Sequence, residues 1–194
     1  TEGFVAVRQT LLGSASTRRE IPGMPALYQG LASGIGNKPE PAFYYLSTGP
    51  WNLYEMLTEF LDIRGFPRGV LHLTDWGPQE RYVMRSGKEH KRLSLARIFA
   101  AYPKTKFVLI GDSGQNDPYV YVEAAREHPR QVRAIVILDV GDHMAERAQE
   151  LVQWQAELDE EGIPFYFVAD AKEAASVMVH HRMVKKEVVT KVAE

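Results

Sequence analysis

The sequence contains no cysteine. This absence excludes disulfide bonds, cysteine nucleophiles and thiolate metal ligands, and it is typical of a protein in a reducing compartment. No apolar run approaches the length of about 20 residues that a membrane-spanning helix needs. The first residues also lack the pattern of a signal peptide. We therefore expect a cytoplasmic protein without a transmembrane segment.

A strong net charge is also missing. The 194 residues carry 23 Lys and Arg against 25 Asp and Glu, which gives a formal net charge of -2. A balance so close to zero gives no electrostatic reason to expect nucleic acid as a partner. The hydrophobic fraction of 45% is ordinary for a globular protein. We expect one domain over residues 1–182, followed by a charged C-terminal tail over residues 183–194 that frays.

Short apolar runs alternate with helical patterns along the chain. The predicted strands cover residues 42–46, 70–73, 107–110, 132–138 and 165–168. The predicted helices cover residues 1–12, 24–32, 50–64, 91–102, 117–128 and 142–160, with a last helix that begins after Asp170. This alternation predicts an α/β fold, a three-layer sandwich around a doubly wound parallel sheet of the Rossmann-like kind.

The run KFVLIGDSGQNDPYVY, residues 106–121, has the clearest functional signal. A buried strand, a loop with two carboxylates and a helix start follow one another within it, and ligands bind at the carboxyl ends of strands in such sheets. The carboxylates of Asp112 and Asp117 suit a hard cation such as Mg2+. The alternative interpretation is that Asp117 only caps the helix that continues with Pro118, and that Asp112 is a turn residue.

Polar side chains also follow other predicted strands. Ser47 comes directly after residues 42–46, and Asp139 ends the strand after the central one, where it could extend an acidic rim. Each has a plainer interpretation: Ser47 could cap a helix that begins at Pro50. Lys91 begins the helix before the central strand, where a lysine is usually solvated.

The order of these residues resembles that of the haloacid dehalogenase superfamily of phosphoryl-transfer enzymes. The segments LSTGPWNLY, GFPRGVLHLTDW, HKRLSLARIFAAYP and FVLIGDSGQNDPYVYVEAAREHP are similar to one family within it. That family is the catalytic domain of the Mg2+-dependent phosphatidate phosphatases of the actin-patch type and their bacterial relatives. The resemblance runs from about residue 21 to residue 139, and FVLIGDSGQNDP is its most specific part.

The resemblance implies a role for each candidate residue. Asp112 and Asp117 correspond to the acidic motif that holds Mg2+, and Lys91, or with less support Lys88, corresponds to the lysine that neutralises the nucleophile and the phosphoryl group. Ser47 corresponds to the hydroxyl that binds a phosphoryl oxygen, with Thr48 as its neighbour in the same loop. Ser113 would offer its amide or hydroxyl to the same anion. Such donors and cations are what phosphoryl transfer requires.

One motif of the superfamily is absent from the chain. The motif Asp-x-Asp-x-Thr, whose first Asp is the nucleophile, occurs nowhere in the sequence. The resemblance places it upstream of Thr1, on a first strand between the strand that ends at Ser47 and the strand that ends at Ile110. We therefore expect the chain as given to be inactive.

Two hypotheses follow from the resemblance and the missing motif. The first is a Mg2+-dependent phosphatase domain for phosphate monoesters, with phosphatidate-like lipids as the implied substrate. A lipid substrate would also imply that the protein binds peripherally at a membrane surface. The second is a non-catalytic phosphate- or metal-binding module on the same fold.

Overall fold

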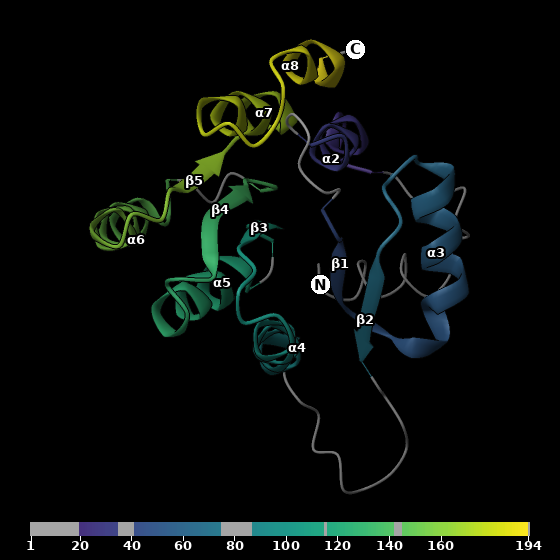
Figure 1. Ribbon diagram of the computed structural model, residues 1–194, viewed down its shortest axis with the longest axis horizontal. Coiled ribbons are helices and arrows are strands. Elements are labelled where there is room, and N and C mark those ends of the chain that lie inside the picture. The colour runs from purple at the N-terminus through teal and green to yellow at the C-terminus, as the bar shows by residue number, and fades with distance from the viewer. Residues whose placement is uncertain (1–19, 35–40, 75–86, 115, 142–144, 194) are drawn as a thin grey trace, which may run out of the picture. The chain divides into compact units, whose positions relative to one another are not determined.

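The computed structural model describes residues 20–34, 41–74, 87–114, 116–141 and 145–193 (Figure 1). The chain divides into two compact units, Thr1–Tyr82 with Met178–Glu194, and Val83–Val177. The predicted helix over residues 1–12 lies outside the described residues. The single domain expected over residues 1–182 stays a prediction, and we describe each unit by itself.

The first unit holds a two-stranded parallel sheet, β1-β2. The predicted strand over residues 42–46 is present but runs further, because β1 continues through the polar residues up to Pro50. The helix expected to open at Pro50 therefore begins later, first as a short 3-10 turn. The elements of this unit are α2 (Met24–Ala32), β1 (Tyr44–Pro50), η2 (Trp51–Leu53), α3 (Tyr54–Ile63), β2 (Val70–Thr74) and α8 (Glu187–Val192).

Half-buried aromatic side chains pack against one another in the first unit. Because side chains alternate along a strand, Phe43 and Tyr45 lie on one face, and both rings stack on Tyr28 of α2, with centroids 5.9 and 6.2 Å away. The Tyr45 hydroxyl donates to the carbonyl of Pro67 at 2.7 Å. Burial raises the pKa of Tyr45 to about 12. Tyr54, at the start of α3, is instead 54% exposed.

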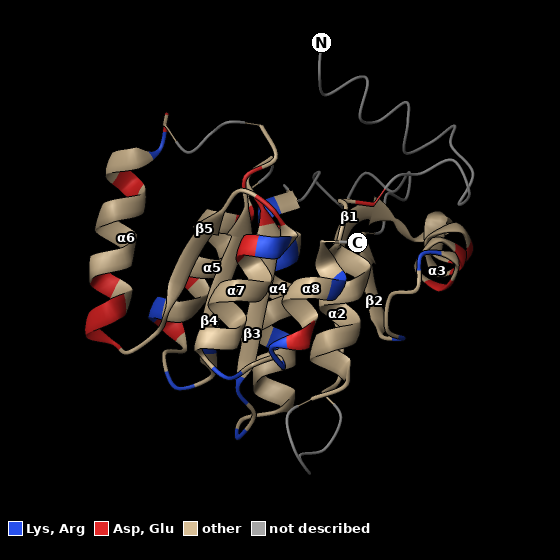
Figure 2. Cartoon of the chain, turned by 90° about the horizontal axis from the view of Figure 1, so that it is seen from above, with Lys and Arg blue, Asp and Glu red and all other residues tan. Residues whose placement is uncertain are grey.

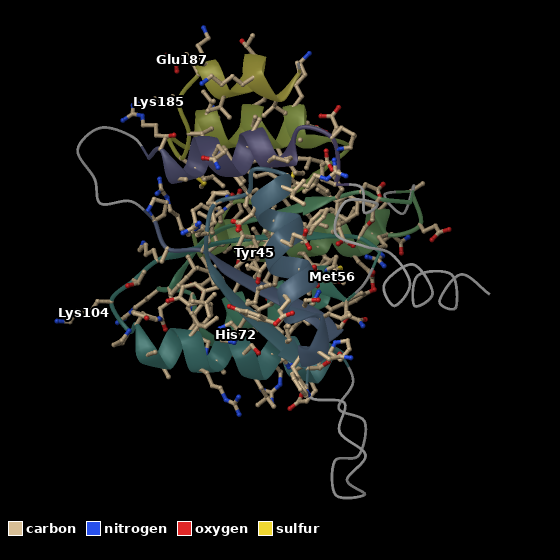
Figure 3. All side chains as sticks on the ribbon, turned by 90° about the vertical axis from the view of Figure 1, so that its right-hand side faces the viewer. Tyr45, Met56, His72, Lys104, Lys185 and Glu187 are labelled. Atoms are coloured by element: carbon tan, nitrogen blue, oxygen red, sulfur yellow. The ribbon has the colours of Figure 1, made fainter. Side chains whose placement is uncertain are left out.

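The predicted frayed tail is also wrong. Residues 187–192 form α8, whose Val188 and Val192 are buried. A Cβ on Gly30 of α2 would lie 2.6 Å from a methyl carbon of Val188, so the two helices touch at this glycine. Figure 3 shows Lys185 and Glu187 projecting away from the ribbon at this end of the chain, which makes the segment amphipathic.

The second unit holds a three-stranded parallel sheet in the order β3-β4-β5. Figure 1 shows α5 and α6 on one side of this sheet and α7 on the other. Helices alternate with parallel strands, as predicted, and the α/β fold class is confirmed. The elements are α4 (Gly87–Ala101), β3 (Phe107–Asp112), α5 (Asp117–Glu127), β4 (Val132–Leu138), α6 (Ala148–Glu160), β5 (Phe165–Val168) and α7 (Ala171–His180), whose residues from Met178 on are counted with the first unit.

Helices α5 and α6 are joined across their surfaces. Arg126 of α5 donates to both carboxylate oxygens of Glu157 at 2.6 and 2.7 Å, and the Tyr119 hydroxyl donates to Glu150 at 3.0 Å. Figure 2 shows the acidic residues of α6 (red) at both ends of the helix. The helix predicted over residues 142–160 is present from Ala148, with Arg147 as its N-cap residue, and Asp142 lies outside the described residues.

The predicted start of the last long helix is confirmed. Asp170 Oδ1 accepts the backbone N–H of Glu173 at 2.8 Å, and the Glu173 carboxylate accepts the N–H of Ala169 at 2.7 Å. These reciprocal bonds resemble a capping box. Among the helices that the structure describes, none is long and apolar enough to cross a membrane.

Candidate functional site

The carboxyl end of β3 carries the first group of predicted site residues. Asp117 is the first residue of α5 and is buried. It does not cap the helix, because Asn116 is the N-cap residue and no side-chain cap bond forms there. Instead, the Asp117 carboxylate forms an ion pair with the ammonium of Lys91 on α4. The capping alternative is therefore wrong for Asp117.

The structure distinguishes the two candidate lysines. Lys91 is only 5% exposed, whereas Lys88, one helical turn earlier, has a side chain that is 45% exposed. Lys88 lies 3.6 Å from Glu123 in a surface ion pair. A buried ammonium needs a partner of opposite charge, and Asp117 supplies one for Lys91. Lys91 is thus the lysine that lies beside the acidic loop.

A glycine allows Asp117 to approach the end of β3. A Cβ on Gly111 would lie 2.7 Å from both Cβ and Oδ2 of Asp117, and 2.8 Å from a ring carbon of Tyr121. Cβ atoms essentially never make contacts this short, so any larger residue would push α5 away from the strand. The Gly-Asp pair in the motif therefore has a packing reason as well as a chemical one.

Asp112 lies close to Asp117 at the end of the same strand. Its Oδ1 accepts the backbone N–H of Gly114 at 2.9 Å, and its own N–H is 3.5 Å from Asp117 Oδ2. Burial raises the pKa of Asp112, and the charge of Asp117 raises it further. The Gly114 bond and Lys91 act in the opposite direction. Ionisation of Asp112 is therefore less favourable in the metal-free protein than ionisation of a solvent-exposed aspartate.

Ser113 does not offer a donor to an anion, contrary to its predicted role. The residue is 1% exposed, and its N–H donates to the carbonyl of Leu138 at 2.8 Å. Its hydroxyl donates to Asp139 Oδ1 at 2.8 Å and accepts the N–H of Val140 at 2.9 Å. Both donors of Ser113 are engaged at the end of β4. The structure therefore does not support the predicted contact between Ser113 and an anion.

Ser47 and Thr48 belong to the first unit and lie in an irregular part of β1. Leu46 pairs with His72 and Pro50 with Thr74, so three residues of β1 stand opposite the single residue Leu73. Bulges of this kind often lie next to active sites. The Ser47 hydroxyl oxygen accepts the N–H of Gly49 at 3.1 Å. Ser47 therefore shapes its own turn and does not cap a helix.

Thr74 fixes the same bulge and was missed by the sequence analysis. Its buried hydroxyl donates to the carbonyls of Thr48 and Gly49 at 3.0 and 3.1 Å. The only signal in the sequence is a hydroxyl residue at the end of the strand VLHLT, which parallel pairing brings next to the Ser47 loop. Where Ser47 and Thr48 lie relative to Lys91, Asp112 and Asp117 stays a prediction.

Two carboxylates at the end of β3 are the groups of this loop that could hold a metal ion. Asp112 and Asp117 provide two carboxylates, and the pKa of Asp112 is raised first by burial and then by the charge of Asp117, which a cation would offset. Mg2+ in phosphoryl-transfer sites usually takes one or two carboxylates, several waters and the substrate phosphate. Within the described residues, no group of three or more His, Cys, Asp or Glu side chains could hold a metal. The described residues therefore do not form a metal site in which protein side chains alone supply three or more of these ligands.

The sequence pattern described as "Phosphatidate phosphatase APP1, catalytic domain" matches residues 1–139. The chain belongs to this family. The match covers both strands of the first unit and continues through β4, so it includes Ser47, Lys91, Asp112 and Asp117. The predicted resemblance is confirmed, and membership in a phosphatase family with it.

Two curated relatives are much longer than this chain. Phosphatidate phosphatase APP1 of Saccharomyces cerevisiae is 30% identical over 127 residues, which are 65% of this chain and 21% of the yeast protein. An uncharacterized protein of Schizosaccharomyces pombe is 29% identical over 98 residues, 50% of this chain and 16% of that protein. The chain thus spans about a fifth of these relatives or less. No solved structure has significant similarity to it.

Proposed function

We propose that this chain forms most of a Mg2+-dependent phosphatase domain that hydrolyses phosphate monoesters, with phosphatidate-like lipids as the substrate class. The family match over residues 1–139 carries this proposal. The buried Lys91–Asp117 pair beside Asp112, at the carboxyl end of a parallel strand, supports it. A lipid substrate would bring the protein to a membrane surface as a peripheral protein of the cytoplasm.

Each residue has a role that follows from its surroundings. Asp112 and Asp117 would hold the Mg2+ ion, which neutralises charge on phosphate oxygens when it is bound. Lys91 holds Asp117 in place and keeps a positive charge at the loop. Ser47 would donate its hydroxyl proton to a phosphoryl oxygen, because its oxygen already accepts the N–H of Gly49. Thr48 is the second phosphate contact of that loop.

The proposed chemistry passes through an aspartyl-phosphate, a covalent intermediate that splits one difficult step into two. No Asp-x-Asp-x-Thr motif occurs in the sequence. We therefore propose that the nucleophile comes from residues upstream of Thr1. If no nucleophile joins this domain, the second hypothesis holds, a module that binds phosphate or Mg2+ without turnover.

An assay of phosphate release tests both hypotheses. The 194-residue chain and a form extended by whatever residues its gene encodes upstream are each given p-nitrophenyl phosphate and phosphatidate in detergent micelles, with Mg2+ or with EDTA. We expect turnover by the extended form only, in Mg2+ only. Turnover by the 194-residue chain would show that the nucleophile is misplaced. Mg2+ binding without turnover in either form would favour the binding module.

A further inference from the structure

The end of β3 is attached to the end of β4 through one buried side chain, Ser113. The parallel ladder pairs Asp112 with Leu138, and the Ser113 N–H extends it by one bond beyond the strand. The Ser113 hydroxyl then bonds both Asp139 and Val140, as donor to the first and acceptor from the second. Its two donors and an acceptor site are thus used by β4 and the residues that follow it.

The residues around Ser113 connect this attachment to the Asp112 carboxylate. Gly114 donates its N–H to Asp112 Oδ1 at 2.9 Å. A Cβ on Gly114 would lie 3.1 Å from that same oxygen and 3.1 Å from a methyl carbon of Val140. Gly114, although exposed, therefore lies between Val140, which Ser113 fixes, and the carboxylate that it contacts. A change at Ser113 has a short physical path to Asp112.

The far side of the attachment is also anchored. Asp139 donates its own N–H to the carbonyl of Val168, the last residue of β5, at 2.8 Å. The acceptor of the Ser113 hydroxyl is thus held by the third strand of the sheet. A serine whose partner is fixed in this way can hold a loop in one position, which a solvent-exposed hydroxyl cannot do.

We propose that Ser113 is a positioning residue, which holds the Asp112 carboxylate in its ligating position by fixing the loop after β3 to the ends of β4 and β5. The inference rests on the proposed function in treating Asp112 as a metal ligand. It needs no contact between Ser113 and the metal or the substrate. Residues that orient a metal ligand typically change metal affinity about 10- to 100-fold when they are removed.

The first test measures Mg2+ affinity of the 194-residue chain by calorimetry. We expect Ser113→Ala and Asp139→Ala to weaken Mg2+ binding about 10- to 100-fold. Asp139→Asn should retain the affinity, because its amide oxygen still accepts the Ser113 proton. Leu158→Ala, which removes a buried side chain of α6 away from the loop, should leave the affinity unchanged and thus serves as the control for lost stability.

The second test does not depend on Mg2+. Amide hydrogen exchange is followed at Val140 and Gly114 in Ser113→Ala. A purely local role predicts faster exchange at Val140 alone, since only its N–H loses an acceptor. The positioning role predicts faster exchange at Gly114 as well, because Asp112 Oδ1 moves away from its N–H.

These outcomes decide the two proposals separately. If the wild-type chain binds no Mg2+, the metal part of the proposed function fails, and Gly114 exchange still decides the role of Ser113. Unchanged Gly114 exchange in Ser113→Ala overturns the inference. So does an Asp139→Asn variant that loses as much Mg2+ affinity as Asp139→Ala, because the Asp139 charge would then act directly.

Discussion

The ammonium of Lys91, in the second turn of α4, and the carboxylate of Asp117, the first residue of α5, form a buried ion pair 26 positions apart in the sequence. The pair lies beside the end of β3, where a glycine leaves room for the Asp117 side chain. A buried pair of this kind stabilises the fold only while both partners are present. It therefore links the stability of the second unit to the candidate site.

Substitution of Lys91 or of Lys88 compares the contribution of the buried ion pair to stability with that of the surface ion pair. Lys91→Met should lower the free energy of unfolding by about 3–5 kcal/mol, because Asp117 is left as an unpaired buried charge. Lys88→Met, the matched control one turn away, should cost less than about 1 kcal/mol. Urea unfolding of both variants measures the difference.

A double variant tests the reason for that loss. Lys91→Met with Asp117→Leu replaces the ion pair by apolar side chains and should recover most of the stability, as such replacements often do. The double variant should bind no Mg2+. Equal destabilisation by Lys88→Met and Lys91→Met would show that the pair at Asp117 is not buried in solution.

Neutralising Asp112 should stabilise the metal-free protein at neutral pH. Burial and the charge of Asp117 raise the pKa of Asp112, so the carboxyl favours folding below its unfolded pKa and loses that contribution as pH rises through its folded pKa. Asp112→Asn removes the ionised form and keeps the acceptor for Gly114.

The measurement is the pH dependence of the free energy of unfolding in EDTA. The advantage of Asp112→Asn over wild type should be absent at low pH, grow as pH rises through the raised pKa, and then level off. Asp159→Asn, on the exposed face of α6, is the control and should stay within about 0.5 kcal/mol of wild type. An Asp112→Asn variant that is less stable than wild type at pH 7 would contradict the prediction.

Alanine at Gly111 and alanine at Gly162 should each destabilise the protein, for different reasons. Gly111→Ala places a methyl group 2.7 Å from Asp117 and should cost about 1–3 kcal/mol by overpacking. It should also weaken Mg2+ binding, since α5 and Asp117 must shift. Gly162→Ala meets no atom within 4 Å but has a φ of +69°, so it should cost about 1 kcal/mol and leave Mg2+ binding unchanged. Calorimetry and urea unfolding check both variants.

The contact between α2 and α8 predicts a non-additive pair of substitutions. Gly30→Ala should destabilise the first unit, because the new methyl lies 2.6 and 2.7 Å from the two methyl carbons of Val188. Val188→Ala should also destabilise it, by loss of a buried side chain. The double variant should lose less than the sum of the two, since the smaller residue makes room for the methyl.

Thermal unfolding of the four proteins gives the coupling free energy, with about 0.5–3 kcal/mol expected for residues in contact. Lys185→Ala, on the exposed side of this segment, serves as the control. Strict additivity of Gly30→Ala and Val188→Ala would mean that α8 does not pack on α2 in solution.

The sequence by itself determined the features that depend on near neighbours. Apolar runs and their punctuation predicted the strands at 107–110, 132–138 and 165–168, and these lie where β3, β4 and β5 begin and end to within two residues. The start of the last helix after Asp170 was also predicted, because the side chains that fix it, Asp170 and Glu173, lie within one turn of each other. The family resemblance likewise depended on an uninterrupted run of residues.

The tertiary structure decided which distant groups meet. The choice between Lys88 and Lys91, and the two bonds of the Ser113 hydroxyl, depend on the path of the chain between α4, β3 and β4, and no local pattern encodes that path. The same holds for Val188, whose charged neighbours predicted a solvated tail, although its own side chain packs on α2. Two lysines three residues apart look alike in the sequence. Only the packing of the chain makes Lys91 the buried partner of Asp117 and leaves Lys88 on the surface.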